Sequence, residues 1–286
     1  MPENRIITLL SDFGLKDVYV GVMKGVIAQI NPCLTVVDLT HEILPQNIAA
    51  AGFNLMNAYS YFPHGTVHVA VVDPGVGSQR RGVAIQIDIG YLVGPDNGLF
   101  SGVLSRTEAL AAVELTNPEY WHTPTPSTTF HGRDIFAAVG AHLASGVPIA
   151  QLGERLDPTT LTSATIPEPT PTASGIRGCI QYIDHFGNLI TNIPGSEVQG
   201  KTWSVSVGDS VSKAVATLGA SALLQSADRT IGSSQTYSDR PVGDVVALIG
   251  SHGWVEIAVN GGSAQQSLQL NWGSTVEVVV SPETKG

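Results

Sequence analysis

Basic residues are scarce in this chain. Its 286 residues include 14 Lys and Arg against 24 Asp and Glu, which gives a net charge of −10 at pH 7. Nucleic-acid binding needs a basic face that neutralises phosphates, so this charge balance argues against DNA and RNA as partners.

Long apolar runs are also missing. The run IITLL at residues 6–10 is shorter than the core of a signal peptide and far shorter than a membrane-spanning helix. We therefore expect a soluble, cytoplasmic protein with no membrane partner.

Cysteine is rare too, with only Cys33 and Cys179 present. Their separation fits neither the CxxC nor the zinc spacings, and we expect both to be buried free thiols. HExxH and HxH motifs are absent as well. Asp73, His131 and Asp134 could meet in the fold, but ligands scattered over strand ends occur in metal and non-metal sites alike, so no metal is predicted.

What is present in the first half is an alternation of strand and helix patterns. Apolar strand-like runs occupy residues 5–12, 34–39 and 66–72, and helix-like runs occupy residues 18–30 and 47–59. On the first helix, Val22, Met23, Val26, Ile27 and Ile30 are expected to face the core. This order predicts an α/β domain over residues 1–160, with βαβ units and a mostly parallel sheet.

The second half of the sequence has a different composition and residue pattern. Residues 161–174 belong to a Pro/Thr/Ser-rich stretch without periodicity, which indicates a linker. Short alternating runs separated by Gly, Ser and Asn follow, and they predict a smaller antiparallel β domain, barrel-like, over residues 175–286.

Polar residues stand where the predicted strands of the first domain end. Asp12 follows the first strand, where it can either accept a ribose diol or cap the turn before the helix. The loop DPGVGSQRR at 73–81 carries Asp73, two glycines that permit close approach to a ligand, and Arg80 and Arg81. It lacks the P-loop and GxGxxG patterns, and a plain turn with a surface Asp–Arg pair is the alternative.

The stretch STTFHGRDIF at 127–136 places His131, Arg133 and Asp134 before a predicted helix. We expect His131 to line a site, and Arg133 and Asp134 to have a structural role at the helix N-terminus. The histidines at positions 41, 64, 68, 122 and 142 have no partner pattern and are expected to be structural or at the surface.

Several motifs together resemble one known family. SDFGxxDxYVGxMKG at 11–25, DLTHEILPQNI at 38–48, VVDPGVGSQRR at 71–81, GPDNGLF at 94–100, FHGRD at 130–134, DHFGNLITNI at 184–193 and the run at 250–264 are similar to the S-adenosylmethionine hydroxide adenosyltransferases. These enzymes hydrolyse S-adenosylmethionine and are related to fluorinating and chlorinating enzymes. The resemblance covers nearly the whole chain and both predicted domains.

The resemblance implies attack of water or hydroxide at the ribose C5′, giving adenosine and L-methionine without a metal or other cofactor. It implies that Asp73, Arg80 and His131 surround the water, with Arg81 as the alternative arginine, and that Asp12 holds the ribose diol. It implies further substrate contacts in the second domain: Asp184 and Asn188 at the methionine amino group, Ser251 and His252 near its carboxylate, Val259, Asn260 and Gly261 at the adenine edge, and Tyr237 close to the base. It also implies a homotrimer, with sites between the first domain of one subunit and the second domain of its neighbour.

Two other functions stay open at this stage. One is a non-catalytic binder or sensor of an adenosyl ligand, and the other is halide-dependent adenosyl transfer. Gln46 stands where the halogenating relatives carry a Trp, and these relatives lack the Asp73, Arg80 and His131 set, so both features favour water as the nucleophile.

Overall fold

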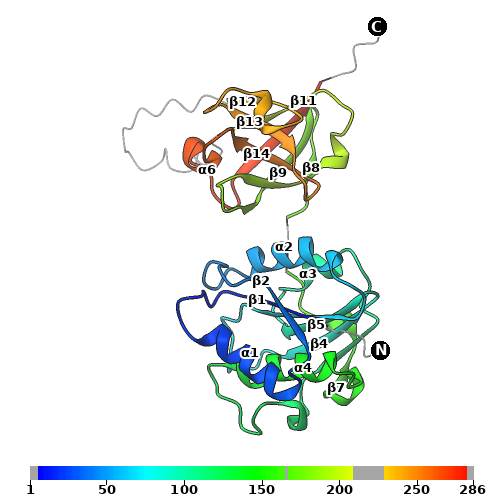
Figure 1. Ribbon diagram of the computed structural model, residues 1–286. Coiled ribbons are helices and arrows are strands. Elements are labelled where there is room, and N and C mark those ends of the chain that lie inside the picture. Colours follow the sequence, from blue (N-terminus) through cyan, green and yellow to red (C-terminus); the bar gives the residue numbers. More distant parts are fainter. Residues whose placement is uncertain (1–5, 165–166, 209–228, 282–286) are drawn as a thin grey trace, which may run out of the picture. The chain divides into compact units, whose positions relative to one another are not determined.

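The computed structural model describes residues 6–164, 167–208 and 229–281. The chain divides into two compact units, Met1–Thr165 and Ile166–Gly286 (Figure 1). Residues 165–166 of the predicted linker lie outside the described residues.

The N-terminal unit is built on a seven-stranded sheet with the strand order β2-β1-β3-β5-β4-β6-β7. Its strands are β1 Ile6–Ser11, β2 Thr35–Thr40, β3 Thr66–Val71, β4 Gly82–Ile87, β5 Gly90–Pro95, β6 Ala111–Glu114 and β7 Glu154–Leu156. Strands β2, β1, β3 and β5 pair in parallel, whereas β4, β6 and β7 pair in antiparallel fashion. The predicted α/β class is confirmed, and the parallel half of the sheet brings the ends of β1, β2 and β3 to one edge.

Helices cover both faces of this sheet, with α1 and α4 on one face and α2 and α3 on the other (Figure 1). They are α1 Tyr19–Ile30, α2 Ile48–Ala58, α3 Ser101–Leu104, and a π-helix, Gly132–Ala137, that continues as α4 Ala138–Ala144. The buried face of α1 is Val20, Met23, Val26 and Ile27. Val22 was predicted on this face but is exposed, because a residue one helical step before Met23 points about 100° away from it.

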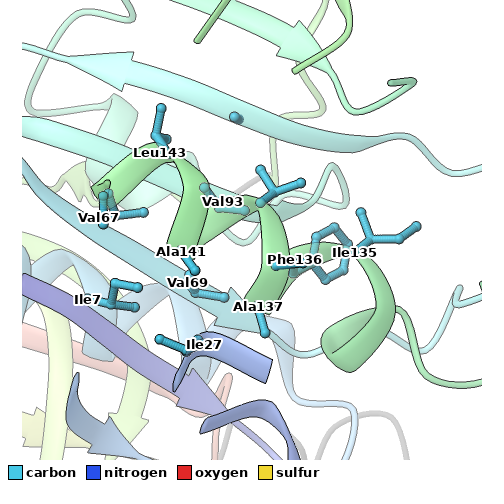
Figure 2. Packing of buried hydrophobic residues seen from close by; sticks show 14 of the residues in the cluster. Ile7, Ile27, Val67, Val69, Val93, Ile135, Phe136, Ala137, Ala141 and Leu143 are labelled. Carbon is cyan, nitrogen blue, oxygen red and sulfur yellow. The ribbon is translucent and has the colours of Figure 1, made fainter. Parts of the chain in front are cut away.

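The helix that follows His131 is anchored in the core. Ile135, Phe136, Ala137, Ala141 and Leu143 belong to one core cluster with Val67 and Val69 of β3, Val93 of β5 and Ile27 of α1, as Figure 2 shows. Phe136 is completely buried, and burial of a side chain of this size contributes roughly 1.5–3 kcal/mol. This packing fixes the first turn of the helix, and His131 lies at its start, only partly buried.

The C-terminal unit is an antiparallel, barrel-like sheet with the strand order β12-β11-β15-β9-β10-β14-β13. Its elements are β8 Thr170–Pro171, β9 Gly175–Ile183, β10 Leu189–Pro194, β11 Trp203–Val207, β12 Arg229–Gly232, β13 Val245–Ile249, β14 Trp254–Val259, helix α6 Ala264–Leu268 and β15 Thr275–Val280. A bridge between Ser233 and Ala247 nearly closes the sheet. The short β8, in the segment predicted as a linker, pairs with β9.

Short 3₁₀ turns connect these elements, at Tyr59–Tyr61, Pro118–Tyr120, Ile149–Gln151, Pro158–Thr160, Gly195–Glu197 and Tyr237–Asp239. Within the described part of the chain, no helix has the length and apolar character needed to cross a membrane.

Candidate active site

A cavity of about 420 Å³ opens in the N-terminal unit where the parallel strands end. Ser11, the last residue of β1, pairs with Val71, the last residue of β3, so the residues that follow each strand lie at the same edge. The cavity is lined by Asp12, Phe13, Tyr19, Pro45, Gln46, Val71, Asp73, Pro74, Val76, Thr129, Phe130, His131 and Gly132. The structure thus brings Asp12, Asp73 and His131 to one cavity.

Arg80 joins Asp73 to His131. Its Nε donates hydrogen bonds to both carboxylate oxygens of Asp73, at 2.9 and 3.0 Å, and its Nη2 donates to Oδ2 as well. The same Nη2 lies 2.9 Å from Nδ1 of His131. Both members of the Arg80–Asp73 ion pair are largely buried, with 11% and 6% of their side chains exposed, so water screens the pair only weakly.

Glycine at position 77 allows this assembly. Gly77 has φ +75°, and a Cβ there would lie 2.2 Å from the carbonyl oxygen of Thr128. Only glycine permits such a close approach in the left-handed region without strain. The loop that carries Asp73 and Arg80 therefore packs directly on the segment that leads to His131.

The contact with Arg80 defines the protonation of His131. A guanidinium has donors and no acceptor, so Nδ1 of His131 is the acceptor and its ring hydrogen is on Nε2. Burial, followed by the positive charge of Arg80, lowers the pKa of His131, while Asp73 and Asp134 act in the opposite direction. The imidazole is therefore neutral at neutral pH and can donate a hydrogen bond from Nε2.

Arg81 has a different place. Its Nε donates to Oδ2 of Asp96 at 2.9 Å, and its Nη2 donates to the carbonyl oxygen of Thr160 at 2.6 Å. Neither arginine lines the cavity, but Arg80 contacts the lining residues Asp73 and His131, whereas Arg81 pairs with Asp96. The structure separates two neighbouring arginines that the sequence could not distinguish, one bonded to the cavity residues Asp73 and His131 and one in a structural ion pair.

Arg133 and Asp134 form an ion pair beside the cavity. Arg133 Nη2 donates to Asp134 Oδ2 at 2.8 Å, and the backbone N–H of Ser127 donates to the same oxygen at 2.8 Å. Burial acts to raise the pKa of Asp134, but these hydrogen bonds outweigh it and hold the pKa below its usual value. Neither side chain lines the cavity, and the pair ties residues 127–134 together. The Asp134 carboxylate accepts from Ser127 and Arg133, and the described residues make no side-chain cap hydrogen bond at the start of the helix.

Asp12 is held by a neighbouring loop. Its Oδ2 accepts the backbone N–H of Gln46 at 2.7 Å. Gln46 itself has φ 66°, an uncommon backbone conformation for a residue with a side chain and one that clusters at functional sites.

The sequence patterns did not predict that three aromatic side chains line the cavity. The rings of Phe13, Tyr19 and Phe130 contact one another, with centroid distances of 5.2–5.8 Å. The available signal was their position in the chain, because Phe13 follows Asp12 and Phe130 precedes His131.

In the C-terminal unit, Asp184 and Asn188 form the turn between β9 and β10. Asp184 Oδ1 accepts the backbone N–H groups of Phe186 and Asn188, at 2.9 and 2.8 Å, and Asp184 Oδ2 accepts from the Asn188 side chain at 2.9 Å. Since Leu189 of β10 pairs with Ile257 of β14, this turn lies at the same end of the sheet as the predicted segment 259–261.

In that predicted segment, Val259 is buried and Gly261 has φ +72°. The Asn260 side chain donates to the carbonyl oxygen of Arg240 at 2.7 Å. Exposed Ser251 and partly buried His252 lie in the turn at the other end of the β13–β14 hairpin.

A buried carboxylate, Glu256, was missed by the sequence reasoning. It accepts a hydrogen bond from the Tyr237 hydroxyl at 2.9 Å and lies 3.0 Å from Nε2 of His252. Nδ1 of His252 accepts the backbone N–H of Trp254 at 3.2 Å, so both ring nitrogens have partners inside this unit. The sequence signal was a charged residue at a buried position of the apolar run WVEIAV.

Among residues 6–164, 167–208 and 229–281, no group of three or more His, Cys, Asp or Glu side chains is arranged to hold a metal ion. The groups at the cavity are one carboxylate–guanidinium–imidazole set and one carboxylate, which suit hydrogen bonding to a polar ligand and a water.

Comparisons with known proteins cover both units. Residues 7–153 match the SAM hydroxide adenosyltransferase N-terminal domain, and residues 178–277 match the corresponding C-terminal domain. The chain is 36% identical over 279 residues to an "(R)-S-adenosyl-L-methionine hydrolase" of Salinispora arenicola, covering 97% of this chain and 99% of that protein.

A "Fluorinase" of an Actinoplanes species is more distant, at 27% identity over 301 residues, covering 96% of this chain and 97% of that protein. The crystal structure of an uncharacterized conserved protein from Thermotoga maritima is similar, with a TM-score of 0.85 and 34% identity over 96% of this chain and 99% of that one.

Proposed function

The chain belongs to the SAM hydroxide adenosyltransferase family, and from this premise we propose that it is a hydrolase that converts S-adenosyl-L-methionine to adenosine and L-methionine. The observation that carries the proposal is the contact of Arg80 with both Asp73 and His131 at one cavity. The hydrolase relatives named in the comparisons support the same reaction.

The leaving group of this reaction does not have to be protonated by the protein. The water oxygen forms a bond to C5′ of the ribose while the C5′–S bond breaks, and the bonding electron pair returns to sulfur. A positively charged sulfonium thereby becomes a neutral thioether, so no general acid is needed. One proton of the attacking water must be removed.

The site's own groups fit the needs of this water. Nδ1 of His131 is occupied by Arg80 and its Nε2 carries hydrogen, so the carboxylate of Asp73 is the proton acceptor of the set. Nε2–H of His131 and the guanidinium of Arg80 orient the water and favour developing hydroxide. A positioned base contributes about 10²–10⁴-fold, and alignment of the water with the C5′–S bond is worth roughly 7–11 kcal/mol. Alignment is therefore the larger effect.

The remaining residues are proposed as substrate contacts. Asp12 accepts the ribose hydroxyls, and in the C-terminal unit the contacts are Asp184, Asn188, Tyr237, Ser251, His252, Val259, Asn260 and Gly261. Their support is the family resemblance together with the partly buried turn at Asp184 and the position of Asp12 in the cavity. The mechanism uses no cofactor, since S-adenosylmethionine is itself the substrate.

The test of the reaction uses ¹⁸O-labelled water. Attack at C5′ predicts adenosine that carries the label in its 5′-hydroxyl and methionine that carries none. Because the relative's name specifies the (R) form, each sulfonium epimer is incubated separately. Intact substrate after long incubation with folded protein would instead support the non-catalytic binder.

Halide-dependent transfer is the second candidate, and the fluorinase likeness is the observation that favours it. Parallel incubations with fluoride, with chloride and without halide decide between the two. A 5′-halo-5′-deoxyadenosine product would replace the hydrolase proposal, whereas halide-independent adenosine formation supports it.

The assembly and the cellular location are also proposed. The resemblance implies a homotrimer whose sites combine the N-terminal unit of one subunit with the C-terminal unit of its neighbour. Refolding a mixture of the inactive variants Asp73→Ala and Asp184→Ala restores partial activity only if a site draws on two subunits. Both described cysteines are free thiols, which fits a reducing cytoplasm. The expectation that both are buried was wrong, since Cys33 is exposed and Cys179 is only partly buried.

A further inference from the structure

Four side chains form a continuous line from the surface of α1 to the end of β1. Lys24 Nζ lies 2.6 Å from Asp38 Oδ2, and Asp38 Oδ1 lies 3.1 Å from His41 Nε2. His41 Nδ1 is hydrogen-bonded to Ser11 Oγ at 2.7 Å. The contact between His41 and Asp38 is electrostatic, because it lies within ion-pair distance without the geometry of a good hydrogen bond.

Nucleophilic hydrolases also contain a Ser–His–Asp set, but the set in this protein is not positioned for nucleophilic catalysis. The Ser11 residue is completely buried, and neither Ser11 nor His41 lines the cavity. A nucleophile must reach its substrate, so this line serves another purpose.

His41 holds both sides of the segment that carries Asp12. On one side its Nδ1 is bonded to Ser11 Oγ, which also accepts the backbone N–H of Phe13 at 3.3 Å. On the other side the His41 carbonyl oxygen accepts the backbone N–H of Gly14 at 2.7 Å. Asp12 lies between these two attachment points.

The same loop also fixes the carboxylate itself. Gln46, five positions after His41, donates its backbone N–H to Asp12 Oδ2. In the part of the chain that the structure describes, the Asp12 carboxylate is hydrogen-bonded only through Oδ2, which leaves Oδ1 and the second acceptor site of Oδ2 for the ligand hydroxyls.

Asp38 and Lys24, which lie on the other side of His41 from Ser11, keep the His41 side chain in place. Burial acts to raise the pKa of Asp38, but the contacts with Lys24 and His41 outweigh it and hold the pKa below its usual value. Asp38 is therefore ionised at neutral pH, and its charge attracts the Nε2 side of the imidazole.

We propose that His41 is a positioning residue for ribose recognition, which acts through Ser11 and Gly14 to aim the Asp12 carboxylate at the diol. The inference rests on the proposed function, because it takes a nucleoside as the ligand. Recognition of two adjacent hydroxyls requires both carboxylate oxygens to be held within about 0.5 Å, so a small rotation of the 11–14 turn loses the recognition.

The test compares adenosine with 2′,3′-dideoxyadenosine, which lacks the diol. Calorimetry on the full-length wild-type protein gives the ratio of their dissociation constants, and we expect a clear preference for adenosine. His41→Leu reduces this preference roughly tenfold or more, the value of a hydrogen bond to a charged group. His41→Asn, whose amide takes the place of Nδ1, restores most of it. In steady-state assays with S-adenosylmethionine, His41→Leu raises KM more than it changes kcat.

A matched control lies in the same sheet. Thr8 on β1 and His68 on β3 form a second buried hydroxyl–Nδ1 pair, at 2.8 Å, and His68 does not line the cavity. His68→Leu should lower stability as His41→Leu does, yet leave the preference for adenosine unchanged. This comparison separates positioning from a general loss of stability.

The outcomes are distinct. An unchanged preference in folded His41→Leu, or equal loss in His68→Leu, overturns the positioning role. If His41→Leu does not fold, Ser11→Ala removes the link with little change in volume and must give the same loss of preference. A wild-type protein without preference refutes both the role of Asp12 and this inference, whereas preference without hydrolysis refutes only the proposed reaction.

Discussion

Nη2 of Arg80 lies 2.9 Å from Nδ1 of His131. Since arginine only donates, this one contact places the ring hydrogen of His131 on Nε2 and turns the imidazole into a donor toward the cavity. In the proposed mechanism it also leaves Asp73 as the base of the set. The roles proposed for the three side chains therefore depend on the direction of one hydrogen bond.

The two neighbouring arginines should respond differently to the same substitution. Lysine keeps the charge but not the fork of donors, so Arg80→Lys loses the simultaneous contacts with Asp73 and His131. We expect kcat to fall by about 10²–10³-fold, as when one donor to a transition state is removed. Arg81→Lys should leave kcat close to wild type and lower the melting temperature, because one ammonium cannot reproduce the two hydrogen bonds that Arg81 donates to buried Asp96. Equal losses of kcat in single-turnover assays would contradict this assignment.

Substitutions at His131 test which ring nitrogen matters. Glutamine presents an N–H near the position of Nε2, whereas asparagine presents its amide near Nδ1. We expect His131→Gln to retain more single-turnover activity than His131→Asn. The reverse order would mean that the contact with Arg80, and not donation from Nε2, is what the reaction requires.

The pH profile of the wild-type protein gives an independent check on His131. Its pKa lies below the usual 6.5, chiefly because of burial and secondly because of Arg80. Protonation of Nδ1 at low pH would remove the acceptor and repel Arg80. Turnover should therefore stay level as pH falls through 6.5 and decline only at lower pH. A decline centred at 6.5 or above, absent in His131→Gln, would contradict a neutral, shielded imidazole.

His68 should make stability depend on pH. Burial lowers its pKa from 6.5 to about 4, so between these values the unfolded chain binds a proton that the folded protein does not. The contribution to stability is complete above pH 6.5 and is lost as pH falls toward 4, by on the order of 3 kcal/mol. Urea unfolding at pH 7 and at pH 4 measures this loss. His68→Gln should show a smaller difference between the two, and an identical difference would refute the assignment.

Tyr237 should titrate unusually late. Burial, followed by the hydrogen bond and the charge of Glu256, raises the pKa of its hydroxyl to about 12. Glu256→Gln removes the charge but keeps an acceptor, so the pKa should fall part of the way toward 10 while the burial effect remains. Difference absorbance titration against Tyr237→Phe isolates this hydroxyl from the other tyrosines. An unchanged titration would show that Glu256 does not act on Tyr237.

Local patterns were sufficient to predict most of the elements. The helices predicted at 18–30 and 47–59 correspond to α1 and α2, because the apolar residues of both segments recur in the sequence with the helical period of 3.6 residues. The runs at 254–259 and 275–280 correspond to β14 and β15. The antiparallel pairing of β4 with β5 and β6 was not predicted, since pairing depends on neighbours far apart in sequence.

Only some of the site residues could be predicted from local sequence patterns. The residues after β1 and β3 were identified because parallel strands end at one edge of a sheet, so Asp12 and Asp73 could be expected together. His41 and Glu256 gave no functional signal, because their partners, Ser11 for the first and Tyr237 for the second, lie 30 and 19 residues away along the chain.

The sequence by itself determined the order of strands and helices, the resemblance to one family, and the kinds of chemical group available to a site. Only the tertiary structure decided which of two adjacent arginines contacts Asp73 and His131, and where the hydrogen of His131 resides. Consecutive residues of an extended chain point in opposite directions, and Arg80 and His131 are 51 positions apart. Their hydrogen bond exists only after the loop at Gly77 has packed against Thr128, and no pattern within either segment encodes it.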